Sequence, residues 1–274
     1  MHTTLSDGRL SPVEAVQLYR NQGYDAVALT DHWFYGSDKE EEGITILSGA
    51  EYNIGGNDAA GEGVFHIVGV GMSRAPSVMK SMSAQQLIDR IHEAGGLAIL
   101  AHPAWSLNTP EQILPLKNVD ATEIYNSVSN VHESRRADSS LIVDMIASRG
   151  RIYPLVAADD THYYEQNEAC FSWIMVEAED NTREALLRAI RRGDFYATQG
   201  PEVHLIKNND GTFTVKCSPC DEIYFFSNLT WTCRAFVGEG LTEAVYTPRE
   251  NESFLRVQVK DACGRLAWTN IVAL

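Results

Sequence analysis

Strand-like and helix-like patterns of apolar residues alternate over about the first 195 residues of the chain. A helix is predicted to begin after Ser11, because serine can cap a helix and Glu14 can hydrogen-bond back to the cap. Further helices are predicted over residues 83–94, from residue 109, up to residue 150 and, capped by Asn181, over residues 181–192. Short apolar runs predict strands over residues 26–30, 44–47, 64–70, 97–101, 121–126, 153–157 and 171–177. Residues 53–63 are rich in Gly, Asn and Asp and are predicted to form a loop.

This alternation predicts an α/β fold, since neighbouring parallel strands need a long crossover connection that is usually a helix. About five to seven strand–helix units can be counted, which favours an irregular barrel over a full eightfold one. We therefore expect residues 1–199 to form one α/β domain.

The pattern changes at Gly200-Pro201, after which no helical period is found. Residues 254–260 alternate apolar and polar side chains, as a half-buried strand does. Turn signals at Asp210-Gly211 and over residues 261–264 are typical of hairpins. Residues 200–274 are therefore predicted to form a small antiparallel β domain.

Composition narrows the function classes. The net charge of −15 disfavours stable nucleic-acid binding, and an anionic substrate would be compatible with it only where metal ions mediate. No apolar run approaches the ~20 residues that span a bilayer, and no leader segment is recognised, so a cytoplasmic location without membrane attachment is expected. Five scattered cysteines do not suggest a disulfide framework. Cys217 and Cys220 have the spacing of a metal or redox pair, but no second pair accompanies them.

Histidine and carboxylate side chains recur at or just beyond the ends of the predicted strands. In parallel sheets and barrels, this is where functional sites are assembled. Imidazole and carboxylate groups together suit Zn²⁺, Mn²⁺ or Fe²⁺, and burying so many of them without cations would be costly. The residues concerned are His2, Asp7, His32, Glu51, His66, His102, Asp160 and His162.

Structural explanations compete for some of these histidines. Taken alone, His66 within an apolar strand is more readily explained as a hydrogen-bonded core residue, and His102 before a proline as a turn residue. His92, His132 and His204 lack any comparable setting and are expected to be structural or exposed.

The order and spacing of several motifs resemble those of the polymerase-and-histidinol-phosphatase (PHP) family. The resemblance covers about residues 1–195 and rests on residues 2–8, 30–32, Glu51, 66–69, 101–103, 123–126 and 160–162. Residues 193–201 and 264–270 resemble the C-terminal extension of one bacterial branch, which contains predicted metal-dependent phosphoesterases and carbamate hydrolases similar to carbaryl hydrolase.

The resemblance implies a distorted seven-stranded (β/α) barrel that holds two to three divalent ions of Zn, Mn or Fe. Three ligand sets are implied, with Glu51 shared between the first two: His2, Glu51 and Asp160; Glu51, His66 and His102; and Asp7, His32 and His162. Asp31 and Asn126 match motif positions near the site, where they would orient a ligand or contact substrate.

One departure from the family concerns the N-terminus. The family opens with His-x-His, and His2 matches its second histidine, so the first would precede Met1. We expect the metal held by His2, Glu51 and Asp160 to be the weakest, and an upstream histidine to raise metal content and turnover.

The leading functional hypothesis is an enzyme, a metal-dependent phosphoesterase that hydrolyses a small phosphate ester, such as a phosphomonoester or a nucleotide or oligonucleotide phosphate, with a metal-bridging hydroxide. A carbamate or amide hydrolase using the same centre is the alternative. A third hypothesis is a metal-binding module whose catalysis is impaired without the first histidine. Arg135 and Arg136 are placed where they would clamp a phosphate, although a solvated helix face explains them more simply.

Overall fold

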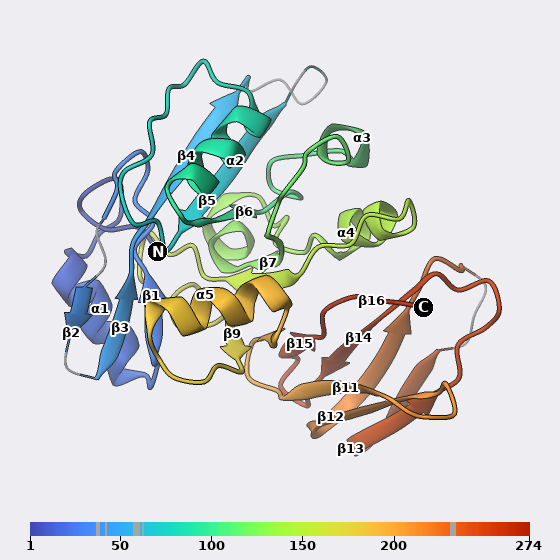
Figure 1. Cartoon of the computed structure of the whole chain (residues 1–274). Helices are drawn as coiled ribbons and strands as arrows, with labels where there is room; N and C mark the ends of the chain where they lie inside the picture. Colours follow the sequence, from blue (N-terminus) through green and yellow to red (C-terminus); the bar gives the residue numbers. More distant parts are fainter. Residues whose placement is uncertain (37–38, 42, 57–60, 62, 231–233) are drawn as a thin grey trace.

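The protein is described by a computed structural model that covers residues 1–36, 39–41, 43–56, 61, 63–230 and 234–274. Within these residues the chain forms three sheets of three, five and eight strands, flanked by helices (Figure 1). No helix in this part of the chain is both long and apolar enough to cross a membrane.

The smallest sheet lies beside the first helix. Helix α1 spans Pro12–Asn21, and its Ser11 cap and Glu14 form the predicted pair of reciprocal hydrogen bonds. Strand β1 (Ala26–Ala28) runs parallel to β3 (Ile44–Leu47), and β3 pairs antiparallel with β2 (Lys39–Glu41). The strand predicted over residues 26–30 is thus shorter than expected, and residue 32 lies beyond its end.

The five-stranded sheet carries most of the candidate site. Its strands, in spatial order, are β4 (Gly49–Gly55), β5 (Val64–Val70), β6 (Leu97–Leu100), β7 (Ala121–Asn126) and β8 (Leu155–Ala158). The β4–β5 and β5–β6 pairs are antiparallel, whereas the β6–β7 and β7–β8 pairs are parallel. The helical segments in this part of the chain are α2 (Ala84–Glu93), α3 (Pro110–Ile113), the π-helix η1 (Ser129–Glu133) and α4 (Ser140–Ala147).

Helices cover this sheet through apolar side chains. Ile88 and Ile91 of α2 belong to the same buried cluster as Tyr52, Ile67 and Leu100 of the strands. On another surface, helix α5 (Arg183–Arg192) buries its own apolar residues in a cluster with β6, β7 and β8. The sheet is therefore a rigid support for the residues at its strand ends.

The predicted (β/α) barrel is wrong. The chain is 19% helical and 34% strand, its larger sheets are mixed or antiparallel, and no (β/α) barrel is formed by the residues described. The physical reason lies at the segment predicted as a loop over residues 53–63. Strand β4 extends to Gly55, and β5 starts only nine positions later, at Val64. Parallel neighbours need a crossover connection of a dozen or more residues, and this connection is shorter. The two strands therefore pair antiparallel. Positions 57–60 and 62 of the predicted loop lie outside the described residues.

The eight-stranded sheet is built mainly from the C-terminal part of the chain. Its members are β9 (Trp173–Val176), β10 (Phe195–Thr198), β11 (Val203–Lys207), β12 (Phe213–Phe226), β13 (Ala235–Tyr246), β14 (Phe254–Lys260), β15 (Leu266–Trp268) and β16 (Val272–Ala273). All of its described pairings are antiparallel. Strands β9 and β10 precede residue 200, so this sheet extends across the position where the two domains are predicted to meet.

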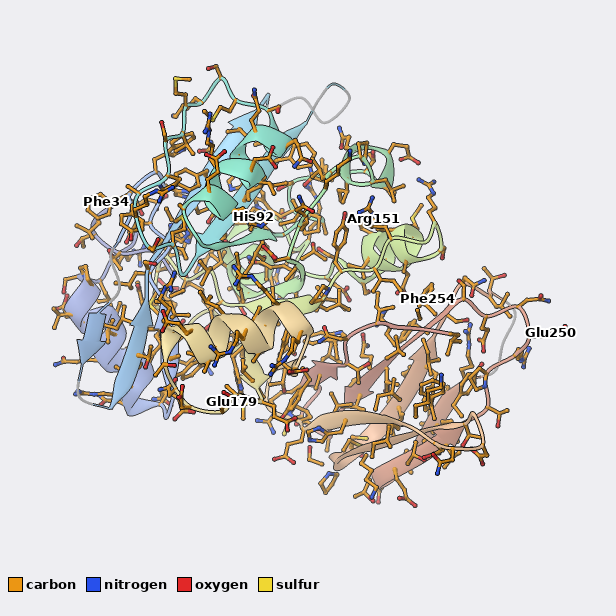
Figure 2. All side chains as sticks on the ribbon, viewed as in Figure 1. Phe34, His92, Arg151, Glu179, Glu250 and Phe254 are labelled. Atoms are coloured by element: carbon orange, nitrogen blue, oxygen red, sulfur yellow. The ribbon has the colours of Figure 1, made fainter. Side chains whose placement is uncertain are left out.

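Apolar contacts join the C-terminal strands to the five-stranded sheet. Phe254 and Trp268 are fully buried and share a cluster with Ile124 of β7 and Val143 of α4. Phe254 is labelled in Figure 2. The Trp268 ring stacks on Tyr125 with a centroid separation of 5.6 Å. The C-terminal strands thus pack against the end of β7.

A buried ion pair fastens the same interface. Arg256 of β14 donates to both carboxylate oxygens of Asp144 on α4, at 2.6 and 2.7 Å, and its guanidinium lies 3.9 Å from the centre of the Phe226 ring. Arg256 is 0% exposed, although the alternating pattern of this strand predicts an exposed side chain. The local pattern of the strand does not reveal Asp144 on α4. The ion pair with Asp144 keeps the Arg256 side chain buried in spite of the alternating pattern.

One predicted helix cap is also wrong. Helix α5 begins after Thr182, whose hydroxyl accepts from the backbone N–H of Ala185. Asn181 instead donates its amide to the carbonyl of Asp25 and so ties this loop to β1.

Removing the Asp144 carboxylate should destabilise the protein strongly. The Asp144→Ala variant leaves the Arg256 charge buried and unpaired, and such a change typically costs about 3–5 kcal/mol. Glu111→Ala breaks the exposed pair with Arg149 at 2.6 Å and is the matched control, with an expected cost of about 0–1 kcal/mol. Urea unfolding measures both. Equal losses of stability in the two variants would contradict the role assigned to the buried pair.

Candidate metal site

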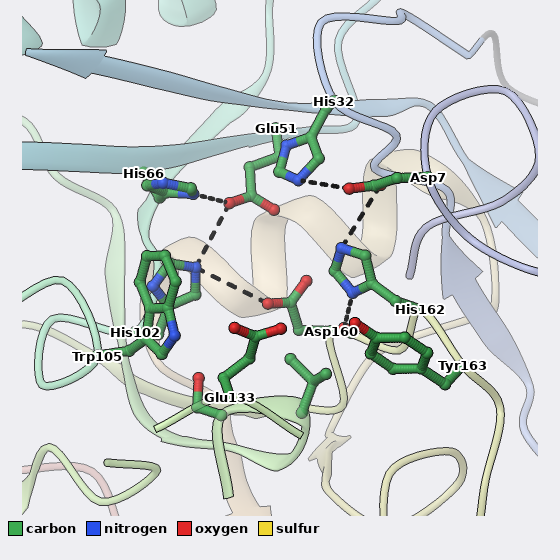
Figure 3. Close-up of a pocket in the computed structure, with 12 residues that line it drawn as sticks. Asp7, His32, Glu51, His66, His102, Trp105, Glu133, Asp160, His162 and Tyr163 are labelled. Atoms are coloured by element: carbon green, nitrogen blue, oxygen red, sulfur yellow. Dashed lines mark hydrogen bonds and ion pairs between the residues drawn. The ribbon is translucent and has the colours of Figure 1, made fainter. Parts of the chain in front are cut away.

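Seven of the eight side chains predicted as metal ligands line one pocket of about 290 Å³ (Figure 3). His2, the eighth, is fully buried. The other residues that line this pocket are Trp105, Val128, Ser129, Glu133 and Tyr163. The predicted ligands are far apart in sequence, so the pocket exists only once the strands have paired.

Two ligands come from neighbouring strands of the β4–β5 hairpin. In this register Glu51 lies opposite Val68, and His66 lies opposite Asn53. Glu51 and His66 are thus diagonal neighbours on one face, a separation that long side chains can bridge. His66 Nδ1 lies 2.5 Å from Glu51 Oε1.

Two others follow the C-terminal ends of parallel strands. His102 comes just after β6 and Asp160 just after β8, and both have left-handed backbone conformations, with φ of 25° and 52°. Positive φ is uncommon for residues other than glycine, although His and Asp are among those that adopt it most often. These backbone turns direct both side chains into the pocket.

Glu51 is the centre of the arrangement. Its Oε2 lies 2.9 Å from His2 Nε2, while its Oε1 faces His66 and also His102 Nε2 at 3.4 Å. The carboxylate is almost fully buried, and each of its oxygens faces a different set of imidazoles. Asp160 lies on the other side of His2 Nε2, with its Oδ1 also at 2.9 Å.

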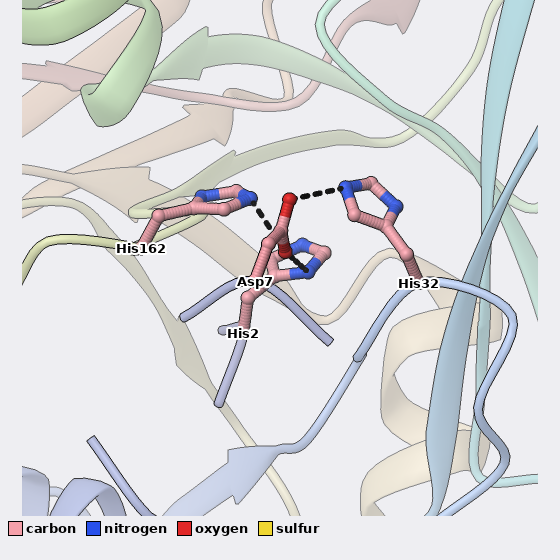
Figure 4. Close-up of side chains that lie close together, drawn as sticks. All are labelled: His2, Asp7, His32 and His162. Atoms are coloured by element: carbon pink, nitrogen blue, oxygen red, sulfur yellow. Dashed lines mark ion pairs between the residues drawn. The ribbon is translucent and has the colours of Figure 1, made fainter. Parts of the chain in front are cut away.

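A second gathering of donors surrounds Asp7. Its carboxylate oxygens lie 3.6–3.7 Å from ring nitrogens of His2, His32 and His162 (Figure 4). The His2 and His162 rings stack with centroids 4.1 Å apart. Asp7 is the most exposed of these groups, so this side of the site faces the solvent.

The donor atoms form three overlapping groups, in each of which all members lie within 4.8 Å of one another. The groups are Glu51, His66 and His102; His2, Glu51 and Asp160; and Asp7, His32 and His162 together with His2. Nitrogen and oxygen donors at this spacing fit first-row divalent cations, and no thiol belongs to any group. The three ligand sets implied by the sequence thus correspond to these groups, apart from the additional proximity of His2 to the third.

Charge interactions explain how the protein keeps these groups buried together. Burial lowers the pKa of His2, but hydrogen bonds to Asp160 and Glu51 outweigh it and raise that pKa to about 9. Burial likewise opposes protonation of His102, and the neighbouring Glu51 raises its pKa to about 9. Burial would raise the pKa of Glu51, but hydrogen bonds from His102, His2 and His66 hold it well below its usual range. Without a cation, protons on the imidazoles compensate the carboxylates.

Asp31 supports the N-terminal segment and lies outside the three donor groups. Its carboxylate accepts from the Thr3 backbone N–H at 2.6 Å, the Thr3 hydroxyl and the Ser6 hydroxyl at 2.8 Å. His2 itself donates its backbone N–H to the Thr161 carbonyl. Asp31 therefore fixes the loop between His2 and Asp7.

Asn126 connects several parts of the site. Its amide nitrogen donates to Asp160 Oδ2 at 3.2 Å and to Glu123 Oε2 at 2.9 Å. Its amide oxygen accepts from the backbone and hydroxyl of Ser129, at the start of η1. Glu123 in turn accepts from the backbone N–H of His102, and burial raises its pKa to about 7.

Sequence reasoning missed two buried carboxylates that hold the loop after β8. Glu168 accepts from the Thr161 hydroxyl and from the backbone N–H groups of His162 and Tyr163. Asp159 accepts from the Tyr19 hydroxyl at 2.6 Å and from backbone N–H groups after the loop, and burial raises its pKa to about 6. Glu168 lies in an irregular segment without a periodic pattern, so no sequence signal pointed to it.

The remaining histidines and the described cysteines lie outside these groups. His92 pairs with Asp120 at 2.7 Å, and His204 packs against Tyr196 in the C-terminal strands. His132 belongs to η1, and its ring contacts that of Tyr163 in a tilted arrangement beside the pocket. The Sγ atoms of Cys217 and Cys220 are 3.6 Å apart on β12. Cys233 lies outside the described residues.

Protons held on His2 and His102 should make the metal-free protein less stable as the pH rises. Their pKa of about 9 in the folded protein exceeds the ordinary histidine pKa of 6.5, so the stabilisation is full below about pH 6.5 and is lost as the pH rises through about 9. Chelator-treated protein should therefore show a falling free energy of unfolding in urea between about pH 7 and 9.5. Replacing both residues by Gln should remove this dependence, whereas His92→Gln should retain it. A flat profile for the unmodified protein would contradict the assignment.

Comparison with known proteins leaves the family undecided. No family model matches the chain. The chain is 28% identical over 118 residues to a protein of Methanocaldococcus jannaschii that is described as uncharacterized. The similarity covers 42% of this chain and spans 66% of the length of that protein, just under two thirds of it.

Proposed function

We propose that the chain is a metal-dependent hydrolase of small phosphate esters and a member of the PHP family. The observation that carries the proposal is the convergence of eight imidazole and carboxylate groups, from residues 2 to 162, into three overlapping donor groups at one pocket. A purely structural role would not need so many titratable groups in one buried place, because each loses water on burial.

The residues present fit two to three divalent ions. Glu51, His66 and His102 would hold one ion, His2, Glu51 and Asp160 a second, and Asp7, His32 and His162 a third. Zn, Mn and Fe are the metals favoured by mixed nitrogen and oxygen donors. Bound divalent cations neutralise charge on a phosphate and lower the pKa of water from ~15.7 towards ~7.

The protein's own side chains would position the metal ions and the substrate. The two oxygens of Glu51 point to different donor groups, so one carboxylate would serve both. Asn126 holds the Asp160 carboxylate in place through its amide. The fixed ligands lower the reorganisation needed when substrate binds, which is how a rigid site contributes to rate.

Size and charge favour a small anionic substrate. A pocket of about 290 Å³ is at the lower end of the range for small-molecule sites. The acidic surface of a chain with net charge −15 repels polyanions such as nucleic acid, so attraction for a phosphate would arise locally from the cations.

Glu51→Gln should abolish hydrolysis and reduce the metal content. A neutral amide presents one oxygen instead of two, so it cannot serve both donor groups, and loss is expected to exceed the ~10–100-fold typical of groups that only orient a ligand. Metal content by mass spectrometry and hydrolysis of a panel of phosphomonoesters measure the two effects. Glu202→Gln, an exposed position outside the pocket, makes the same change of charge and is the matched control.

A chelator should likewise abolish activity, and Mn²⁺ or Zn²⁺ should restore it. Hydrolysis that survives complete metal removal would contradict the proposal. If the metal-loaded protein cleaves carbamates or amides but no phosphate ester, the proposed metal site stands and the proposed substrate class is wrong. A protein that retains the metals and cleaves none of these compounds would be a binding module.

A further inference from the structure

We propose that Glu133 selects the substrate by contacting its alcohol part, favouring esters with hydrogen-bond donors there and excluding those with a further negative charge. The inference rests on the proposed phosphoesterase function and concerns a residue outside the three donor groups.

The position of Glu133 is the first reason. Five residues line the pocket without belonging to a donor group, and Glu133 is the carboxylate among them. Figure 3 shows its side chain directed into the pocket, on the side of Asp160, between Trp105 and Tyr163. A phosphate held by the donor groups would leave its alcohol part facing these residues.

The second reason is that Glu133 has no partner. Among the described residues its side chain forms no hydrogen bond or ion pair, whereas the other pocket carboxylates, Asp7, Glu51 and Asp160, all lie beside imidazoles. The free carboxylate oxygens of Glu133 can therefore accept hydrogen bonds from a ligand and will repel a ligand anion.

The third reason is that its backbone is held firmly relative to the site. Glu133 ends the π-helix η1, in which Ser134 N–H bonds to the Ser129 carbonyl, and short π segments are frequent at functional sites. The start of η1 is fixed by Asn126, the same side chain that donates to Asp160. Near the end of η1, the His132 ring contacts the Tyr163 ring, with centroids 4.4 Å apart and an angle of 41° between the ring planes.

The aromatic side chains limit what fits beside the carboxylate. The Trp105 ring lies 4.9 Å from that of His102, and the Tyr163 ring lies 6.3 Å from that of His162, so both adjoin the ligands. They offer apolar surface to the carbon skeleton of a substrate, while Glu133 offers the acceptor. The combination fits a small phosphorylated polyol better than a phosphorylated acid.

The test compares three esters with similar three-carbon skeletons: glycerol 3-phosphate, propyl phosphate and 3-phosphoglycerate. Glycerol 3-phosphate carries hydroxyl donors, propyl phosphate carries none, and 3-phosphoglycerate carries a second anion. Their dissociation constants are measured by calorimetry on Zn-loaded protein, so the result does not depend on turnover. The unmodified protein should bind glycerol 3-phosphate most tightly and 3-phosphoglycerate most weakly.

Glu133→Gln should narrow the discrimination against 3-phosphoglycerate relative to propyl phosphate by about tenfold, because the like-charge repulsion is removed while the size is kept. Glu133→Ala should also remove the advantage of glycerol 3-phosphate over propyl phosphate. Glu202→Gln changes the net charge equally and should leave all three ratios unchanged. A general loss of fold would lower all affinities together and would not change their ratios, and thermal unfolding checks it.

Identical ratios in the unmodified protein and in Glu133→Gln would overturn the role of Glu133. Failure of the proposed function has a different outcome, in which the esters bind but none is hydrolysed, and the ratios then still decide the role of Glu133. If none of the three esters binds the metal-loaded protein, both proposals are overturned.

Discussion

The burial of the Glu51 carboxylate among three imidazoles is the constraint on which the candidate site depends. A carboxylate this deep in the protein is stable only when paired, and His2, His66 and His102 supply the pairing. The same arrangement explains the opposite pKa shifts of the imidazoles and the carboxylate, since each stabilises the charged form of the other. A cation would take over the role of the protons, so metal binding and proton release should be coupled.

The mixed sheet is what brings these groups together. Antiparallel pairing places Glu51 and His66 diagonally on one face, while parallel pairing of β6, β7 and β8 brings residues 102, 126 and 160 to one end. Buried acceptors then fix the loops, with Asp31 holding the N-terminal segment and Glu168 the segment after β8. The C-terminal strands pack against the end of β7 and so stiffen it from outside.

The sequence supported prediction of the local elements better than of their arrangement. Capping boxes at Ser11 and Ser83 and the strand over residues 64–70 were readable because their signals are local. The barrel prediction was wrong because the relative direction of two strands depends on the connection between them, here the one between β4 and β5. The glycine-rich residues 53–63 were predicted to be a loop, whereas β4 extends to Gly55. The side chains proposed as ligands lie close together despite this error, because each motif follows or occupies a strand whichever way the strands pair. The hydrogen bonds of Glu168 and the burial of Arg256 depend on tertiary partners, which no local pattern specifies.

The left-handed backbone at His102 and Asp160 restricts what evolution or engineering can place there. Each such conformation costs of order 1–3 kcal/mol. The free energy of folding offsets this cost before any ligand binds. A replacement must therefore satisfy the backbone as well as the chemistry. Asn retains tolerance for this geometry, whereas β-branched residues do not. At these two positions the range of tolerated amino acids should be narrower than coordination chemistry alone would allow, and a conservative change in donor type can fail for reasons of shape.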